Sequence, residues 1–129
     1  MAGRTLRVLV VDDNETVRRT ISQILRSEAD FEVVWEAVDG ADAVRKIREH
    51  KPDVVLLDIT MPAMNGLEVA EIIKTESPSV QVLIVSQHDS RGFRWAALAA
   101  GVSGYVNKSN VGKDLIPELR RIQCLRQSA

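Results

Sequence analysis

Five polar residues stand at the ends of short apolar segments: Asp12, Asp13, Asp58, Ser86 and Lys108. Asp58 follows four consecutive aliphatic residues, which is typical of a central strand of a parallel sheet with both faces covered. An unpaired buried carboxylate is costly, so we expect Asp58 at the carboxyl edge of the sheet, where open α/β folds place their chemistry. The other four residues follow further predicted strands. The sequence therefore predicts that all five meet at one edge.

The chemistry of such a group is that of phosphoryl transfer. Three carboxylates within a few ångströms cannot all stay ionised unless one takes a proton or a cation binds. Oxygen ligands of this kind suit Mg²⁺. The ammonium of Lys108 and the hydroxyl of Ser86 can both donate to phosphoryl oxygens. Asp58 would then be the acceptor, because this reaction depends mostly on positioning and charge neutralisation.

The elements that must position these residues alternate along the chain. β-Branched and aliphatic runs predict strands at 6–11, 31–37, 54–57, 80–85 and 104–106. Apolar residues at helical spacing follow each strand, with Asp13 or Asn14 as the cap of the first helix and Gly101 after the fourth. Leu115, Leu119, Ile122 and Leu125 predict a last helix, and Pro117 is tolerated only near a first turn, so this helix should start between residues 113 and 116.

Five strand–helix alternations predict an α/β fold with a doubly wound parallel sheet and helices on both faces. The length of 129 residues predicts one domain, 1–129. A net charge of −1 gives no electrostatic footprint for nucleic acid. No segment approaches a membrane span, the first five residues do not form a secretion signal, and the single Cys124 cannot form an internal disulfide. We therefore expect a cytoplasmic protein.

Several motifs match one family in order and at strand ends. They are Asp12-Asp13, the segment 58–66 (DITMPAMNG), Ser86, and Tyr105-x-x-Lys108. With these motifs the chain resembles the receiver domain of bacterial two-component response regulators over about residues 5–126. The segments 86–89 and 100–105 are most similar to the NarL/LuxR branch. The resemblance implies a flavodoxin-like sheet of strand order 2-1-3-4-5 with five helices.

The resemblance also implies roles at the acidic site. Asp58 would be the phosphorylated residue. Asp13 and Asp58 would bind Mg²⁺ together with the backbone carbonyl of Thr60, and Asp12 would act mainly through a water molecule. Lys108 would hold the phosphoryl group.

Further residues would respond to the phosphoryl group. Ser86 and Tyr105 would be the switch pair that remodels the face made by helix four, strand five and helix five. His88, with Thr60, would tune self-hydrolysis, whereas an exposed loop histidine is the alternative reading. The chain departs from many receivers at Ser109, which stands where they carry proline.

The resemblance names partners as well. A histidine kinase or a phosphotransfer protein would donate the phosphoryl group, and an output domain or a second copy would read the remodelled face. Trp95 and Ala99 are expected together on the outer side of the fourth helix, as a candidate interface or as a tryptophan folded over its own helix. Trp35 is expected to be partly buried in the second strand.

Two other functions remain open from the sequence. A haloacid-dehalogenase-like phosphatase also uses an aspartate after its first strand, but it requires Asp-x-Asp, and here the acids are adjacent and Asn14 follows. A scaffold could bind partners without phosphorylation, although all five key residues are present. The favoured hypothesis is a phosphorylation switch with self-phosphorylation and slow self-dephosphorylation, and not an enzyme that turns over a substrate.

Overall fold

The computed structural model describes residues 5–58, 66–87 and 91–128, with the side chains at 66, 91–94 and 126–128 left aside. The elements in chain order are β1 (Leu6–Val11), α1 (Glu15–Arg26), β2 (Phe31–Ala37), α2 (Gly40–His50), β3 (Val54–Leu57), α3 (Gly66–Glu76), β4 (Gln81–Ser86), α4 (Arg91–Ala99), β5 (Gly104–Asn107) and α5 (Val111–Ser128). A short 3-10 helix (Lys108–Asn110) joins β5 to α5.

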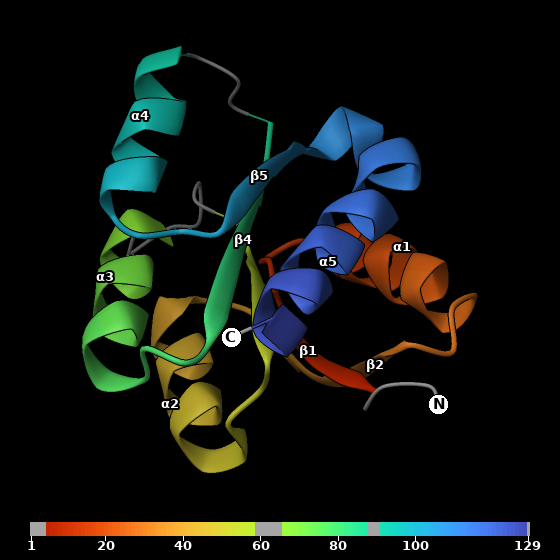
Figure 1. The fold of residues 1–129 in the computed structure, drawn as a ribbon, viewed down its shortest axis with the longest axis horizontal. Helices are drawn as coiled ribbons and strands as arrows, with labels where there is room; N and C mark the ends of the chain where they lie inside the picture. Colours follow the sequence, from red (N-terminus) through yellow and green to blue (C-terminus); the bar gives the residue numbers. More distant parts are fainter. Residues whose placement is uncertain (1–4, 59–65, 88–90, 129) are drawn as a thin grey trace.

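The five strands form one parallel sheet in the order β2-β1-β3-β4-β5. Helices α2, α3 and α4 cover one face of it, and α1 and α5 cover the other (Figure 1). The predicted fold class and strand order are therefore confirmed. All carboxyl ends of the strands lie at one edge, because parallel strands joined by right-handed crossovers run the same way.

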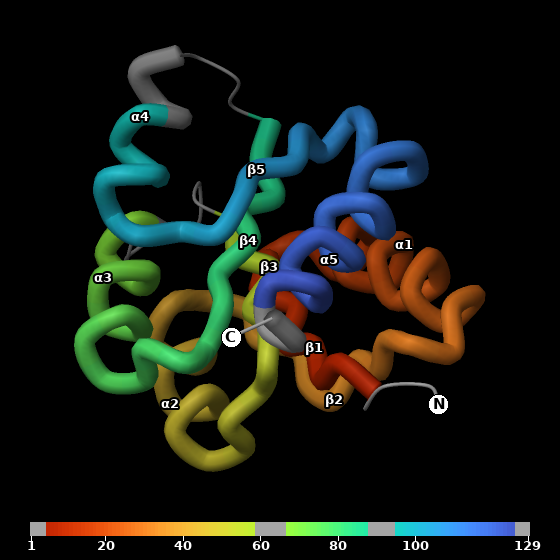
Figure 2. Tube along the Cα trace, viewed as in Figure 1, coloured from red at the N-terminus to blue at the C-terminus, as the bar shows by residue number. Residues whose placement is uncertain are grey.

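Each face of the sheet has its own apolar core. β3 is fully buried on both sides, since each of its four residues is at most 1% exposed. One core lies beneath α2, α3 and α4, and the other beneath α1 and α5, which pack side by side (Figure 2). Two buried faces explain why the sequence of this strand shows no polar alternation.

Local signals fix where the helices begin and end. The side chain of Asn14 accepts a hydrogen bond from the amide of Val17 at 3.1 Å and caps α1. Asp39 caps α2 in the same way, through the amide of Asp42 at 2.8 Å. Gly101, with φ of 87°, turns the chain after α4 into a conformation that favours glycine.

The start predicted for the last helix was wrong. α5 begins at Val111, so Pro117 lies inside the helix. The side chain of Asn107 caps the preceding 3-10 turn by accepting from the amide of Ser109 at 2.9 Å, which starts the helical path earlier. The carbonyl of Lys113, which Pro117 leaves without an amide partner, is on an exposed side of the helix where water can bond to it.

Two large apolar side chains, Leu125 and Trp35, are exposed, and for Trp35 the prediction of partial burial was wrong. Leu125 is 56% exposed, although it continues the helical spacing of the buried Leu115, Leu119 and Ile122. Trp35 is 43% exposed, because β2 is an edge strand and only the end of α2 reaches over it. The Trp35 ring stacks on His50 with the ring centroids 4.1 Å apart.

No helix in the described part of the chain is long and apolar enough to cross a membrane.

Candidate functional site

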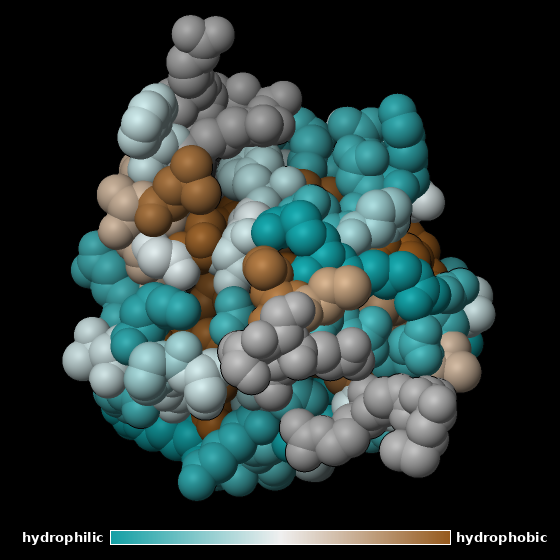
Figure 3. Space-filling model, in the orientation of Figure 1, coloured by the Kyte–Doolittle hydropathy of each residue, from teal (hydrophilic) through white to brown (hydrophobic). Residues whose placement is uncertain are grey.

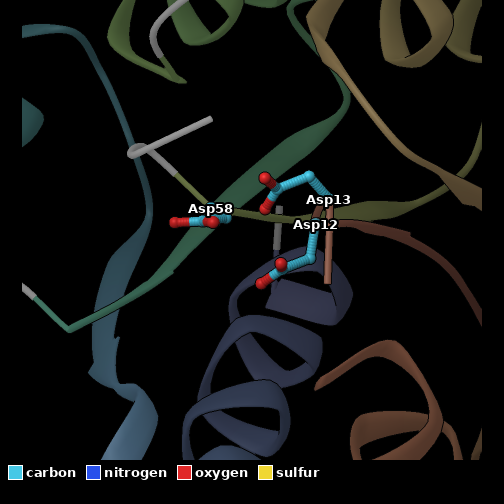
Figure 4. Close-up of side chains that lie close together, drawn as sticks. All are labelled: Asp12, Asp13 and Asp58. Atoms are coloured by element: carbon cyan, nitrogen blue, oxygen red, sulfur yellow. The ribbon is translucent and has the colours of Figure 1, made fainter. Parts of the chain in front are cut away.

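Three carboxylates converge where β1 and β3 end. These strands are neighbours, with Val11 paired to Leu57, so the residues that follow them emerge side by side. The Asp58 amide donates to the carbonyl of Val11 at 3.0 Å and extends that pairing. Oxygens of Asp12, Asp13 and Asp58 all lie within 4.8 Å of one another, and the three side chains point into a shared space (Figure 4). The predicted convergence is confirmed for these acids.

The three acids differ in their exposure to water. Asp12 and Asp58 are each only 2% exposed, whereas Asp13 is exposed. Two buried carboxylates beside a third acid form a site that strongly favours a cation.

Lys108 supplies one positive charge to this site. Its ammonium lies 2.8 Å from Oδ2 of Asp12 and 3.1 Å from Oδ2 of Asp58, and its side chain is 14% exposed. It reaches the acids from the end of β5, two strands away from β3. The sequence prediction that Lys108 meets Asp58 is therefore confirmed.

The pKa values of two groups reflect this environment. Burial raises the pKa of Asp12 above its ordinary value, and the charge of Asp58 acts in the same direction. Hydrogen bonds from Lys108 and from the Asn14 amide lower the pKa of Asp12 but do not cancel the effect of burial. Burial lowers the pKa of Lys108, but Asp12 and Asp58 outweigh it, so the pKa of Lys108 rises and the ammonium stays charged.

The two residues proposed as a switch pair lie on neighbouring strands. Ser86, at the end of β4, is fully buried. Tyr105 in β5 pairs in register with Ile84, so Tyr105 and Ser86 are diagonal neighbours on one face of the sheet. The tyrosine is half-buried with its hydroxyl oxygen enclosed, and its ring packs against the core beneath α2, α3 and α4.

The exposed side chains of α4 that the structure describes, at residues 95–99, are apolar. Trp95 is 69% and Leu98 is 60% exposed, and Ala99 is exposed beside them. Apolar surface gathers over this helix (Figure 3), and residues 95–107 contain no charged side chain. The prediction that Trp95 and Ala99 face outward together is confirmed. Thr60 and His88 lie outside the described residues.

Arg18 is a residue that the sequence analysis missed. It lies on the inward side of α1, three, four and seven residues before the buried Ile21, Ser22 and Leu25, and its side chain is only 14% exposed and hydrogen-bonds to the carbonyl of Asp12. The helical spacing was the available signal, since it places Arg18 on the same side of α1 as the buried residues. The partner of Arg18, the Asp12 carbonyl, is visible only in the structure, because it depends on how β1 and α1 are joined in space.

The donor set at this site fits one class of metal ion. Carboxylate oxygens without sulfur or imidazole suit a hard cation such as Mg²⁺, which uses one or two carboxylates and keeps several waters.

Comparison with known proteins identifies the family. A family model described as "Response regulator receiver domain" matches residues 8–120. The chain is a response regulator receiver domain. It is thus a signalling domain of two-component systems and not a member of an enzyme family, and the match gives no support to the phosphatase alternative.

Relatives of this receiver domain support the NarL/LuxR branch. The response regulator protein VraR from Staphylococcus aureus (strain NCTC 8325 / PS 47) is 38% identical over 117 residues, covering 91% of this chain and 56% of VraR. A two-component response regulator of the LuxR family from Aurantimonas sp. SI85-9A1 has a TM-score of 0.90 at 34% identity, with 95% of this chain and 87% of that chain covered. The receiver domain therefore spans about half the length of the curated relatives it matches.

A third comparison concerns a complex that contains a metal ion. The CheX-CheY-BeF3-Mg+2 complex from Borrelia burgdorferi includes a chain with a TM-score of 0.87 to this receiver domain at 28% identity. The alignment covers 93% of this chain and 90% of that chain.

Proposed function

We propose that this chain is a phosphorylation-dependent switch that accepts a phosphoryl group on Asp58 from a histidine kinase or a phosphotransfer protein, with Mg²⁺ as cofactor. The observation that carries the proposal is the meeting of Asp12, Asp13, Asp58 and Lys108 at one edge of the sheet. The presence of Mg²⁺ in the Borrelia burgdorferi complex agrees with this cofactor.

Asp58 is the proposed acceptor because of its position. It lies at the end of the central strand β3, between the acids after β1 and the Lys108 that follows β5. A carboxylate oxygen of Asp58 would attack the phosphorus, forming a P–O bond while the bond from phosphorus to the donor nitrogen breaks. Apart from this attack the protein takes no covalent part in the transfer, so positioning and charge neutralisation would provide most of the catalysis.

The neighbouring acids would hold the metal ion. Asp13, Asp58 and the Thr60 carbonyl are the proposed direct ligands, and Asp12 would act through a water molecule. Bound there, Mg²⁺ neutralises charge on the incoming phosphoryl group. The exposure of Asp13 supports this assignment, since the ion must enter from the solvent side.

Lys108 would change partners during the reaction. Its ammonium now bonds to both Asp12 and Asp58. With a metal ion held by the acids and a phosphoryl group attached to Asp58, Lys108 would donate to a phosphoryl oxygen instead. The protein would thus exchange one set of charge-assisted hydrogen bonds for another.

The added charge of about −1.5 to −2 would shift the switch residues. The hydroxyl of Ser86 would donate to the phosphoryl group, and the Tyr105 ring would follow it. Thr60 and His88 would govern how easily water reaches the acyl phosphate. Besides its self-phosphorylation, the switch would undergo slow self-dephosphorylation, whose rate would depend on these two side chains.

The face made by α4, β5 and α5 would transmit the signal. Trp95 and Ala99 on α4 are the proposed contact residues, supported by the exposed apolar side chains at residues 95–99. An output domain or a second copy of the chain would bind there. We also propose that residues 1–129 form one domain that does not itself bind nucleic acid, in keeping with its net charge of −1.

Intact mass spectrometry after incubation with acetyl phosphate tests the proposal. We expect the natural sequence to gain one phosphoryl group with Mg²⁺ and none with a chelator, and Asp58→Ala to gain none in either condition. If the folded natural protein gains no mass with Mg²⁺, the proposal fails and the scaffold alternative is favoured.

A further inference from the structure

Arg18 links α1, β2 and the acidic loop. Its Nη1 donates to the backbone carbonyl of Asp12 at 2.7 Å, and its Nε donates to Oε1 of Glu36 at 2.9 Å. With only 14% of its side chain exposed, the guanidinium is fixed at both ends and largely shielded from water. A planar guanidinium that donates hydrogen bonds to two different partners can hold a backbone segment in one place.

The bond from Arg18 completes the set of hydrogen bonds around Asp12. The Asp12 amide donates to the carbonyl of Ala37 at 3.1 Å, Oδ1 accepts from the Asn14 amide at 2.8 Å, and Oδ2 lies 2.8 Å from Lys108. The carbonyl of Asp12 is the remaining polar group, and Arg18 binds it. Every polar group of Asp12 therefore has a partner within the described part of the chain.

Asp13 has no comparable support of its own. Among residues 5–58, 66–87 and 91–128, its carboxylate has no hydrogen bond or ion pair, and it is exposed. Its place near Asp58 thus depends on the backbone that carries it. The carbonyl of Asp12 belongs to the same rigid peptide plane as the amide of Asp13, so a bond to that carbonyl restricts the direction in which Asp13 leaves the loop.

We propose that Arg18 is a positioning residue for Mg²⁺ binding, acting through the peptide between Asp12 and Asp13. The inference rests on the Mg²⁺ site of the proposed function and extends it to a residue outside that site. Arg18 holds the loop in the conformation in which Asp13 and Asp58 present oxygens to the same ion. Partners one step removed from metal ligands commonly raise metal affinity by fixing ligand orientation.

The direction in which Mg²⁺ affinity changes when the charge of Arg18 is removed distinguishes a positioning role from a purely electrostatic one. A guanidinium near a cation site repels the cation, and Glu36 offsets that repulsion only in part because it is itself half exposed. If Arg18 acted through its charge alone, removing the charge would strengthen Mg²⁺ binding. The positioning role predicts the opposite, a weaker site.

Arg19 is a matched control on the same helix. It carries the same charge one residue further on, but its partner is Glu15, and both side chains are largely exposed, at 65% and 73%. Arg19→Met removes a positive charge near the site without touching the acidic loop. Arg18→Met removes the charge and both hydrogen bonds while keeping an apolar side chain of similar length.

The experiment is a calorimetric titration of each variant with Mg²⁺ alone. We expect Arg18→Met to bind Mg²⁺ roughly tenfold more weakly than the natural sequence. Arg19→Met should bind it equally or slightly more tightly. Arg18→Lys, which retains one donor group, should recover part of the affinity, and this variant decides the matter if Arg18→Met does not fold.

A second readout separates positioning from general damage. The rate of phosphorylation by acetyl phosphate, followed against Mg²⁺ concentration, should need more Mg²⁺ in Arg18→Met but approach the natural rate at saturation. If Arg18→Met binds Mg²⁺ as tightly as the natural sequence or more tightly, or if Arg19→Met weakens binding as much as Arg18→Met does, the positioning role of Arg18 is overturned. The proposed Mg²⁺ site would not be affected by either result. Failure of the natural sequence to bind Mg²⁺ would overturn this inference and the proposed cofactor together.

Discussion

Charge balance at single residues dominates the chemistry of this receiver domain. Two nearly buried carboxylates, Asp12 and Asp58, share one ammonium, that of Lys108, while a third acid faces solvent. Burying ionised groups is costly, and the arrangement persists because each buried charge is paired. Loss of any one partner therefore has a consequence that depends on which charge it leaves behind.

Lys108→Met should destabilise the metal-free protein. The substitution keeps the apolar stem but leaves Asp12 and Asp58 buried without their shared cation, so we expect a loss of about 2 to 4 kcal/mol in urea unfolding with chelator. Mg²⁺ should reduce the deficit, because it neutralises the same acids. Lys113→Met, on the exposed first turn of α5, is the control and should change little. Equal stability of the two variants would contradict the account.

Asp13→Ala should behave in the opposite way. Removing this exposed acid relieves repulsion with Asp12 and Asp58, so the variant should melt at or above the temperature of the natural sequence in chelator. The rise in melting temperature that Mg²⁺ gives the natural protein should disappear, since a metal ligand is lost. A melting temperature several degrees lower in chelator would show that Asp13 has a structural role instead.

The raised pKa of Asp12 makes stability depend on pH in a defined direction. The native state retains the Asp12 proton at pH values where the unfolded chain, with the ordinary value of 3.8, has lost it. Protonation of Asp12 therefore stabilises the native state, and that contribution is lost as pH rises through the native pKa. Compared with Asp12→Asn, the natural protein should gain unfolding free energy as pH falls toward 3.8 without metal. A loss over that range would reverse the expected sign.

At the scale of elements, the ends of the strands were predictable from the sequence. The exposure of side chains on the edge strand and the start of the last helix were not. The Leu6–Val11 run and the Asp39-Gly40 break carry local signals, period and capping, that determine strand and helix without tertiary contacts. The exposure of Trp35 follows from the edge position of β2, which the residue types within β2 do not reveal and which only the strand order implied by the resemblance supplied. The position of Pro117 inside α5 depends on the 3-10 turn that begins at Lys108, several residues upstream.

The candidate site divides in the same way. Asp58 and Lys108 are predictable because each ends a strand, and parallel strands bring their carboxyl ends together. Arg18 is not, because its bond to the Asp12 carbonyl depends on the angle at which α1 leaves the loop. Side chains that serve a site through backbone contacts leave no pattern in the sequence.

Fluorescence of Trp95 tests whether α4 takes part in the switch. The chain has two tryptophans, so the measurement uses a Trp35→Phe background in which only Trp95 remains. Beryllium fluoride with Mg²⁺, which mimics the phosphoryl group, should change the emission of this exposed indole if its helix face is remodelled. The same background with Asp58→Ala should show no change. An unchanged spectrum with binding confirmed by calorimetry would assign Trp95 to local packing.

At the scale of the whole molecule, the sheet separates chemistry from output. The acidic site occupies the carboxyl edge, and α4, with the exposed apolar residues Trp95 and Leu98, lies on the flank of the same sheet. β4 and β5 connect the two, because Ser86 and Tyr105 lie on these strands as diagonal neighbours. The effect of a charge added at Asp58 can be transmitted to the α4 face by shifts of a few packed residues. Such an arrangement suits a two-state switch.

The most direct test of the account is to locate the acyl phosphate. Borohydride reduces an aspartyl phosphate to homoserine, so peptide mass spectrometry after acetyl phosphate, Mg²⁺ and borohydride identifies the residue that carried the phosphoryl group. We expect homoserine at position 58 and aspartate retained at positions 12 and 13. Homoserine at Asp12 or Asp13, with Asp58 unmodified, would contradict the central claim that the site is built around Asp58 as acceptor.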